Sequence, residues 1–350
     1  MMLWRKAEKR QPTHAQRLFH GLVREWLWIG LLLLPMTAYL SLSPGLALNN
    51  PLYDSLRRLA PLPVDPRIVL VTIDDPSLKE LGRWPWPRSL HADLIDRLSA
   101  AQPAAILFDV IFSEPGVPAN DQRLAAAVCN AGNVVLPLLR EEAANYSTPD
   151  AQMLPLLKCA KGLGHINVEA DSDGVVRSLF MREGPPGDTT PQLAWVAYAL
   201  SGQASEMPGE PQQPINPSWH REHAIRIPFI AADTRFPTVS YASVIRGEVE
   251  PERLRGRLIL VGATASGMGD RFVTPLSSTV GTTAGVEIQA NVLNGLLQGR
   301  SIVDLPGAVS ALMATAWVAL LLGLLLYRPR YALWMTLGCM ATALLGAWVL

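Results

Sequence analysis

An uncharged apolar segment from Trp26 to Leu48 constrains this chain more than any other feature of its sequence. About 20 apolar residues in a helix cross the hydrocarbon core of a bilayer, and this segment is long enough to do so. Tryptophans stand at its start, where aromatic side chains anchor membrane helices, and its Pro35 is tolerated in such a helix. The sequence therefore predicts a first membrane helix at residues 26–48.

A basic tail at residues 1–25 precedes this helix and carries six lysines and arginines against two glutamates. Because positively charged flanks stay in the cytoplasm, we expect the tail to be cytoplasmic. A cleaved signal peptide is the alternative, and the small residues near Ala47 leave it open. The length of the tail and of the apolar segment favours an uncleaved anchor.

Two further apolar segments stand at the other end of the chain, at residues 307–327 and 331–350. The turn between them, residues 328–330, contains Arg328 and Arg330, so the positive-inside rule places it in the cytoplasm as well. Residues 49–306 would then lie outside the cytoplasm. The sequence predicts a multi-pass membrane protein with a large exported domain.

The given sequence stops within its third apolar segment. On this topology that segment crosses outward, so a cytoplasmic output domain would need a further membrane helix after Leu350. We therefore expect the chain to be the sensor and anchor part of a longer protein. A short protein that ends there is the alternative.

Composition narrows the function further. The formal net charge of the 350 residues is +0, so bulk electrostatics gives no support to nucleic-acid binding. Cys129 and Cys159 both fall in the exported domain, where an oxidising compartment permits pairing, although two unpaired buried thiols are the favoured interpretation. Cys339 falls in the third apolar segment, and no Cys/His spacing is typical of a zinc site.

The exported domain begins as an alternation of strands and helices. Residues 68–73 form an unbroken apolar run, as expected for a strand buried on both faces of a parallel sheet. A helix opened by Arg88, a strand at 104–112, a helix at 121–130 with Asp121 as its N-cap, and a strand at 133–139 follow. This order predicts an α/β fold with a mostly parallel sheet flanked by helices, in addition to the transmembrane helices.

The second half of the domain is less regular. Residues 162–182 predict a hairpin whose turn is at 171–174, and residues 224–230 predict a strand, possibly antiparallel. A buried strand that ends at Ala263 returns to the sheet. The closing helix, residues 285–298, leads almost directly into the second membrane helix. Because the connection is short, a shift of the closing helix would be transmitted to the membrane helix.

Polar side chains follow several of the predicted parallel strands. Ligands of open α/β sheets bind beyond the carboxyl ends of the strands, so these residues are candidates for a ligand site. The candidates at the strand ends are Asp74, Asp75, Asp109, Glu114, Thr264 and Asp270, and those expected nearby are Arg88, His91, Arg271 and Thr274. Carboxylates with arginines suit a small polar or ionic signal molecule. Carboxylates alone suit a divalent cation such as calcium or magnesium, and we expect no other cofactor.

A structural role is the alternative for each of these residues. Asp74 and Asp109 would then bind loop amides, Arg88 would neutralise a neighbouring acid, and Asp173 would be a turn residue. The Gly-rich stretch at 262–269 lacks the Lys-Ser/Thr ending of a phosphate-binding P-loop. No nucleophile lies in a G-x-S-x-G setting, so we assign no catalytic residue.

The motifs of the exported domain as a set resemble those of the type-2 CHASE domain, an extracellular sensor of bacterial signalling proteins. The matching stretches are IVLVTIDDPSLKELGRWPWPR, HADLIDRLSAAQPAAILFDVIFSEP, LGHINVEADSDGVVR, SYASVIRG, LRGRLILVGATASGMGDRFVTPLSS and GVEIQANVLNGLLQG. They cover nearly all of residues 65–300. The positions typical of the family are Asp74, Arg88, Asp109, Asp173, Arg177, Asp270 and Thr274. The resemblance does not decide whether these residues define the fold or bind a ligand.

The resemblance implies signal reception and supplies no ligand. It implies a membrane-bound sensor histidine kinase, with a nucleotide cyclase as the alternative output, and a cytoplasmic response regulator as the partner of the kinase. A homodimer is expected by analogy. An exported hydrolytic or metal-binding enzyme that uses the acidic strand ends, and an envelope scaffold without a ligand, are the rival interpretations.

Overall fold

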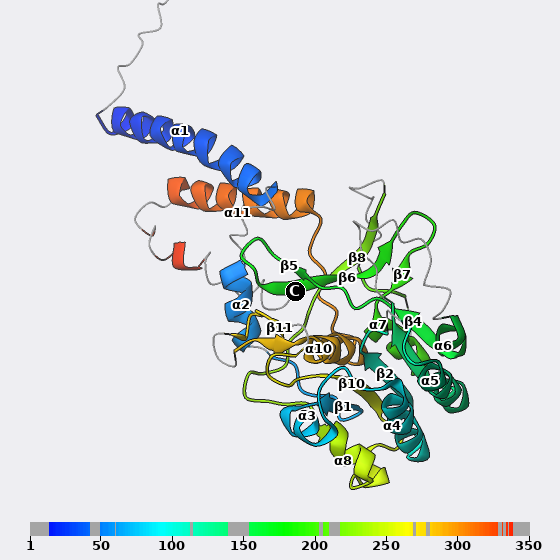
Figure 1. Cartoon of the computed structure of the whole chain (residues 1–350). Helices are drawn as coiled ribbons and strands as arrows, with labels where there is room; N and C mark the ends of the chain where they lie inside the picture. The colour runs from blue at the N-terminus through cyan, green and yellow to red at the C-terminus, as the bar shows by residue number, and fades with distance from the viewer. Residues whose placement is uncertain are drawn as a thin grey trace, which may run out of the picture. The chain divides into compact units, whose positions relative to one another are not determined.

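The computed structural model describes most of the chain (Figure 1). The described residues are 14–42, 50–59, 61–112, 115–138, 154–202, 206–209, 218–268, 271–277, 281–327, 331, 334 and 336–338. They divide into two compact units. The first combines Met1–Leu48 with Leu305–Leu350, and the second is Asn49–Asp304.

The second unit is built on a parallel sheet of six strands in the order β4-β3-β2-β10-β1-β9. The strands are β1 (Ile68–Ile73), β2 (Ala105–Asp109), β3 (Val134–Pro137), β4 (Gly162–Gly164), β9 (Thr238–Ser240) and β10 (Leu258–Ala263). Every residue of β1 is buried. The predicted α/β fold is confirmed, and so is the reading of residues 68–73 as a strand covered on both faces.

Helices cover both faces of this sheet (Figure 1). The helices of the second unit are α2 (Asn50–Leu59), α3 (Asp75–Leu81), α4 (Arg88–Ala100), α5 (Pro118–Ala131), α6 (Leu154–Cys159), α7 (Leu193–Leu200), α8 (Tyr241–Arg246) and α10 (Gly285–Leu297), with a 3₁₀ turn η3 (Pro251–Arg253). Because side chains of a strand alternate between its faces, Ile68 and Leu70 enter the core beneath α7 and α10. Val69 and Val71 enter the core beneath α4, α5 and α8.

A smaller antiparallel sheet centres on β6 (Val176–Gly184), which pairs with three short neighbours. These are β5 (Glu169–Ala170), β7 (Thr190–Pro191) and β8 (His220–Arg226), and a separate two-stranded ribbon joins β11 (Arg271–Phe272) to β12 (Thr283–Ala284). The predicted hairpin is confirmed for β5 and β6. Residues 162–164, however, pair with β3 instead and extend the parallel sheet.

The first unit contains two apolar helices, α1 (His14–Leu42) and α11 (Gly307–Tyr327). They lie side by side, with Gly30 against Leu322 (Figure 1). By length and composition, Val23–Leu42 (mean hydropathy 1.4) and Gly307–Tyr327 (mean hydropathy 2.3) are each able to cross a membrane. Residues 43–49 and most of the third apolar segment lie outside the described residues.

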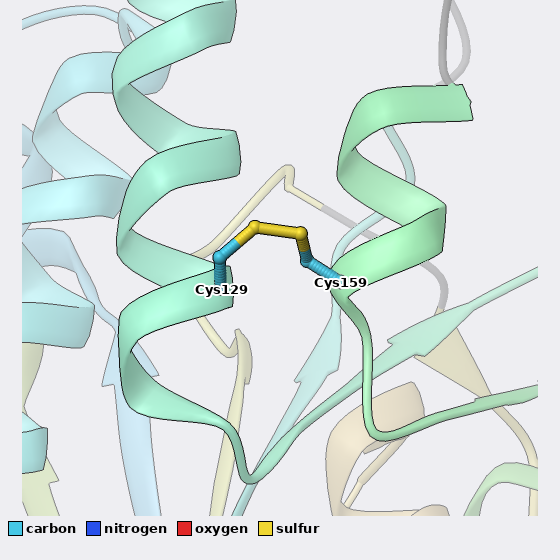
Figure 2. The surroundings of a disulfide bond; sticks show 2 residues. All are labelled: Cys129 and Cys159. Atoms are coloured by element: carbon cyan, nitrogen blue, oxygen red, sulfur yellow. A yellow bond between two sulfur atoms is a disulfide. The ribbon is translucent and has the colours of Figure 1, made fainter.

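Two local predictions were wrong. Helix α5 begins at Pro118, and Asp121 therefore sits in its first turn instead of capping it; its carboxylate accepts a hydrogen bond from the Gly116 amide. Cys129 and Cys159 are not separate thiols but form a disulfide between α5 and the end of α6, with their Cα atoms 4.7 Å apart (Figure 2). Their pairing depends on how α6 packs on α5, which spacing along the chain does not reveal.

Candidate functional site

Asp74 and Asp75 directly follow the strand β1. Asp74 is the N-cap of the helix α3, and Asp75 is its first residue. The carboxylate of Asp74 accepts hydrogen bonds from the Ser77 amide (2.9 Å) and the Ser240 hydroxyl (3.0 Å), so it caps α3 and ties it to the end of β9. The carboxylate of Asp75 accepts a hydrogen bond from the Ser266 amide (3.1 Å). Both aspartates thus fasten loops at this edge of the sheet.

Arg88 and His91 belong to the first turn of α4. Arg88 pairs with Asp121 of α5 at 2.8 Å, and its guanidinium lies 5.7 Å from the ring centre of Phe112. His91 is buried, and its Nδ1 lies 3.0 Å from the hydroxyl of Tyr241. Burial, aided by the positive charge of Arg88, lowers the pKa of His91 to about 4. His91 is therefore a neutral core residue among aromatic rings at ordinary pH.

The remaining described candidates are Asp109, Thr264, Thr274 and Arg271, of which Thr264 and Arg271 contact each other. Asp109 ends β2 opposite Gly262, and the amide of Thr264 donates to the Ile73 carbonyl (3.0 Å). Thr274 is buried, with its hydroxyl 3.0 Å from that of Thr283. The guanidinium of Arg271 donates to the side chain and backbone of Thr282 and, at 3.4 Å, to the carbonyl of Thr264. Glu114 and Asp270 lie outside the described residues.

Apart from the contact between Thr264 and Arg271, the hydrogen bonds and ion pairs given above for the described candidates join them to residues outside the predicted set. In the described part of the chain, no three His, Cys, Asp or Glu residues come together in a way that suits a metal ion. The arrangement supports the structural role that we considered for Asp74 and Arg88. It leaves ligand binding at these positions a prediction.

A pocket of about 210 Å³ opens beside the first two turns of α10. We call it the α10 pocket. Its lining includes the polar residues Arg235, Arg271, Thr283, Glu287 and Asn291 and the apolar residues Phe229, Ile230, Phe236 and Leu276. Of the predicted site residues that the structure describes, Arg271 lines this pocket.

Arg177 of β6 is buried and binds three carboxylates at once. Its guanidinium donates to both oxygens of Asp54 in α2 (2.8 Å each), to Asp171 (2.7 Å) and to Asp173 (2.9 Å). The hydrogen bonds from Arg177 hold the pKa of Asp173 below its usual range, and those to the carboxylates raise the pKa of Arg177. We call these four residues the Arg177 junction.

Arg226 at the end of β8 makes a second junction. Its side chain pairs with Asp304 at 2.5 Å and lies 4.6 Å from the ring centre of Tyr53 in α2. Its backbone amide donates to the carbonyl of Ile302 (2.8 Å), and burial raises the pKa of Tyr53 to about 12. The Arg226 junction therefore joins β8 to α2 and to residues 302–304.

Buried amide side chains of α10 hold the segments around it. Asn294 accepts a hydrogen bond from the Asp65 amide (2.8 Å) and donates to the Pro63 carbonyl (3.0 Å), which fixes the connection from α2 to β1. Asn291 accepts from the Ile230 amide (2.8 Å). Because buried polar groups are costly to leave unpaired, movement of α10 has to carry these segments with it.

The sequence indicated only part of these features. Arg177 and Asp173 stood out through the resemblance, but Asp54 and Asp304 did not. Nothing in the sequence around them marks a partner 123 or 78 residues away in the chain. Arg235 falls in a short loop with no motif. Glu287 and Asn291 looked like ordinary polar positions of an amphipathic helix.

The CHASE2 domain family model matches residues 26–328, which is most of the chain. Comparison with curated proteins and with solved structures found no match. The family match agrees with the resemblance carried by the motifs and with the parallel sheet and apolar helices of the structure. This chain belongs to the CHASE2 domain family, whose members are extracellular sensor domains of signalling receptors.

Proposed function

We propose that this chain is the signal-receiving and membrane-anchoring region of a bacterial inner-membrane receptor with a histidine kinase output. Three observations support it: the CHASE2 match, two helices apolar enough to cross a membrane, and a disulfide of the kind that persists in an oxidising compartment. The large unit, Asn49–Asp304, would lie outside the cytoplasm and receive the signal.

The observation that carries the proposal is the attachment of both membrane-adjoining segments to one sheet. Only residues 43–49 separate α1 from α2, and only residues 305–306 separate Asp304 from α11. Arg177 of β6 binds α2 through Asp54, and Arg226 of β8 binds Asp304. Since β6 and β8 are paired strands, a change in this small sheet acts on both chain segments together.

Helix α10 offers a second route to the same end. It packs on the parallel sheet, holds the connection from α2 to β1 through Asn294, and is separated from α11 by residues 298–306. A ligand shifts the balance between two arrangements of the domain only by its difference in affinity for them. A signal that favours one position of α10 therefore alters the segments that lead to both membrane helices.

A homodimer and a cytoplasmic response regulator complete the proposed pathway. Two-fold pairing is the commonest symmetry of homo-oligomers, and it would give one sensor a partner against which its helices move. Cross-linking of the chain in native membranes would give a dimer band. A single monomeric species in membranes and in nanodiscs would count against the pairing.

The direct test compares the output of membranes that hold the receptor with and without its junctions. We expect Asp54→Asn and Asp304→Asn each to change the rate of histidine phosphorylation from ATP, while the exposed control Asp93→Asn leaves it unchanged. Formation of a cyclic nucleotide from ATP or GTP, with no phosphohistidine, would replace the kinase by a cyclase. Unchanged output of either kind in both junction variants would contradict the proposed transmission.

A further inference from the structure

We propose that the α10 pocket binds a small organic carboxylate, with Arg235 and Arg271 holding the carboxylate group. That such binding acts as the signal rests on the proposed function; the binding itself rests on the pocket alone. The ligand class follows from the size of the pocket, its charge and the surfaces that enclose it.

The size of the pocket limits the ligand. Its volume of about 210 Å³ is below the range of about 300–1,000 Å³ that is typical of pockets for drug-sized molecules. Buried side chains of Phe229, Phe236 and Leu276 form part of its wall. The pocket therefore suits a compact molecule, such as a short-chain or aromatic acid, better than a peptide.

The charge of the pocket selects an anion. Among the described residues, its lining contains two guanidinium groups, from Arg235 and Arg271, against one carboxylate, from Glu287. Guanidinium groups present parallel N–H donors that match the two oxygens of a carboxylate. The positive end of the α10 helix, which begins at Gly285, adds to the same preference.

The hydrogen bonds already present show which groups are left for a ligand. Arg235 is exposed, and its Nη1 donates to the carbonyls of Ala232 and Thr234. Within the described part of the chain, its Nε and Nη2 have no hydrogen-bond acceptor. Arg271 donates two hydrogen bonds to Thr282 and one, at 3.4 Å, to the carbonyl of Thr264, which fix its guanidinium before any ligand arrives. One N–H on each of its Nη1 and Nη2 is left for a ligand.

The other polar groups of the pocket are committed to the protein. Glu287 accepts a hydrogen bond from the Ala284 amide as part of the cap of α10. The side chain of Asn291 accepts from the Ile230 amide and donates to the Glu287 carbonyl (2.8 Å). Recognition of the anionic group therefore falls to the two arginines, both of which still have N–H groups to donate.

The position of the pocket explains how a bound ligand would affect the segments that adjoin the membrane helices. Thr283, Glu287 and Asn291 come from β12 and the first two turns of α10, and Ile230 comes from the segment after β8. A carboxylate held between Arg235 and Arg271 thus bridges the segment after β8 to β11, whose partner strand β12 leads directly into α10. Both of these elements lead to the segments that adjoin the membrane helices.

The test is isothermal titration of the purified full chain in nanodiscs with single, defined probes. The probes are propanoate, benzoate, succinate and inorganic phosphate at matched pH and ionic strength. We expect at least one carboxylate to bind more tightly than phosphate. Arg235→Ala should weaken that binding at least tenfold, Arg235→Lys should weaken it less, and the exposed control Arg255→Ala should leave it unchanged.

The variants also separate a lost contact from a lost fold. Because Arg235 is exposed and bonds only to local carbonyls, we expect its variants to keep the unfolding midpoint of the parent chain. Binding of no carboxylate, preferential binding of phosphate, or carboxylate binding that both Arg235→Ala and Arg271→Ala leave intact would overturn the proposal. Carboxylate binding without any effect on output would leave the pocket in place and contradict the receptor function instead.

Discussion

The two carboxylate oxygens of Asp54 each accept a 2.8 Å hydrogen bond from the guanidinium of Arg177, which joins helix α2 to strand β6. The pair is bidentate and nearly excluded from solvent on the arginine side, the geometry in which charge-assisted hydrogen bonds are strongest. Asp171 and Asp173 hold the same guanidinium from its other edge. Helix α2 follows the first helix that is able to span a membrane. It is thus fixed by a residue, Arg177, that lies more than a hundred positions further along the chain.

Asp54→Asn should weaken this contact without emptying the site. The amide retains an acceptor for Arg177 but loses its charge and one of its two acceptor oxygens, so we expect the free energy of unfolding to fall by about 1–3 kcal/mol. Urea denaturation of the full chain in nanodiscs measures the change. Asp93→Asn is the matched control, because Asp93 pairs with Arg123 at an exposed position and such pairs contribute little. Equal effects of the two changes would contradict the special role of Asp54.

Arg177→Met should be more damaging than Asp54→Asn. It removes the cation shared by three carboxylates and leaves Asp54, Asp171 and Asp173 facing one another. Breaking a buried ion pair on one side costs about 3–5 kcal/mol, and we expect a loss of that order in the free energy of unfolding. Combination of Arg177→Met with Asp54→Asn should recover part of it. A double variant as unstable as the sum of the single ones would show that the residues are not coupled.

The buried His91 should make the domain less stable in mild acid. The pKa of His91 is about 4 in the folded chain and about 6.5 in an unfolded one, so the unfolded state binds more protons between these values. The free energy of unfolding should therefore rise from pH 4 to pH 6.5, by up to about 3 kcal/mol from this group. His91→Phe should flatten this part of the profile. The phenol of Tyr241, which lies against Nδ1 of His91, keeps its proton over this range because burial raises its pKa. A profile unchanged in the variant would exclude His91 as the cause.

The disulfide should stabilise the domain substantially. It closes a loop between residues 30 apart in the sequence, for which the loop-entropy relation gives about 3–4 kcal/mol. Cys129→Ser and Cys159→Ser should each lower the free energy of unfolding by this order, and the double variant should lose no more than either alone. Urea denaturation with and without a reductant checks it. A reductant effect on the double variant as large as on the parent chain would exclude the disulfide as its source.

The framework of the fold was predictable because its signals are local. The unbroken run at residues 68–73, the alternation of strands and helices after it, and the apolar face of residues 285–298 each depend on neighbours in the sequence. Helix α3 was missed because it follows the strand end directly, with Pro76 in its first turn where a turn was the simpler interpretation. Strand β9 was missed because three residues carry too little pattern to recognise.

The candidate sites were less predictable because they depend on contacts between distant residues. The strand-end rule led to Asp74, Asp75 and Arg88, and the structure gives each of these a local partner. Arg271 was predicted for the strand ends and lies in the α10 pocket, where its companion Arg235 comes from a different loop. No spacing within the sequence relates Asp54 to Arg177 or Arg226 to Asp304, because the fold alone brings them together.

The placement of the large unit outside the cytoplasm is the claim on which the receptor function depends. Labelling of intact cells with a membrane-impermeant maleimide tests it in chains that lack Cys339, with one new thiol at a time. We expect Arg255→Cys, at an exposed position of the large unit, to react in intact cells, and Arg328→Cys, between the apolar segments, to react only after lysis. Reaction of the thiol at position 328 in intact cells, with position 255 shielded until lysis, would contradict the receptor function.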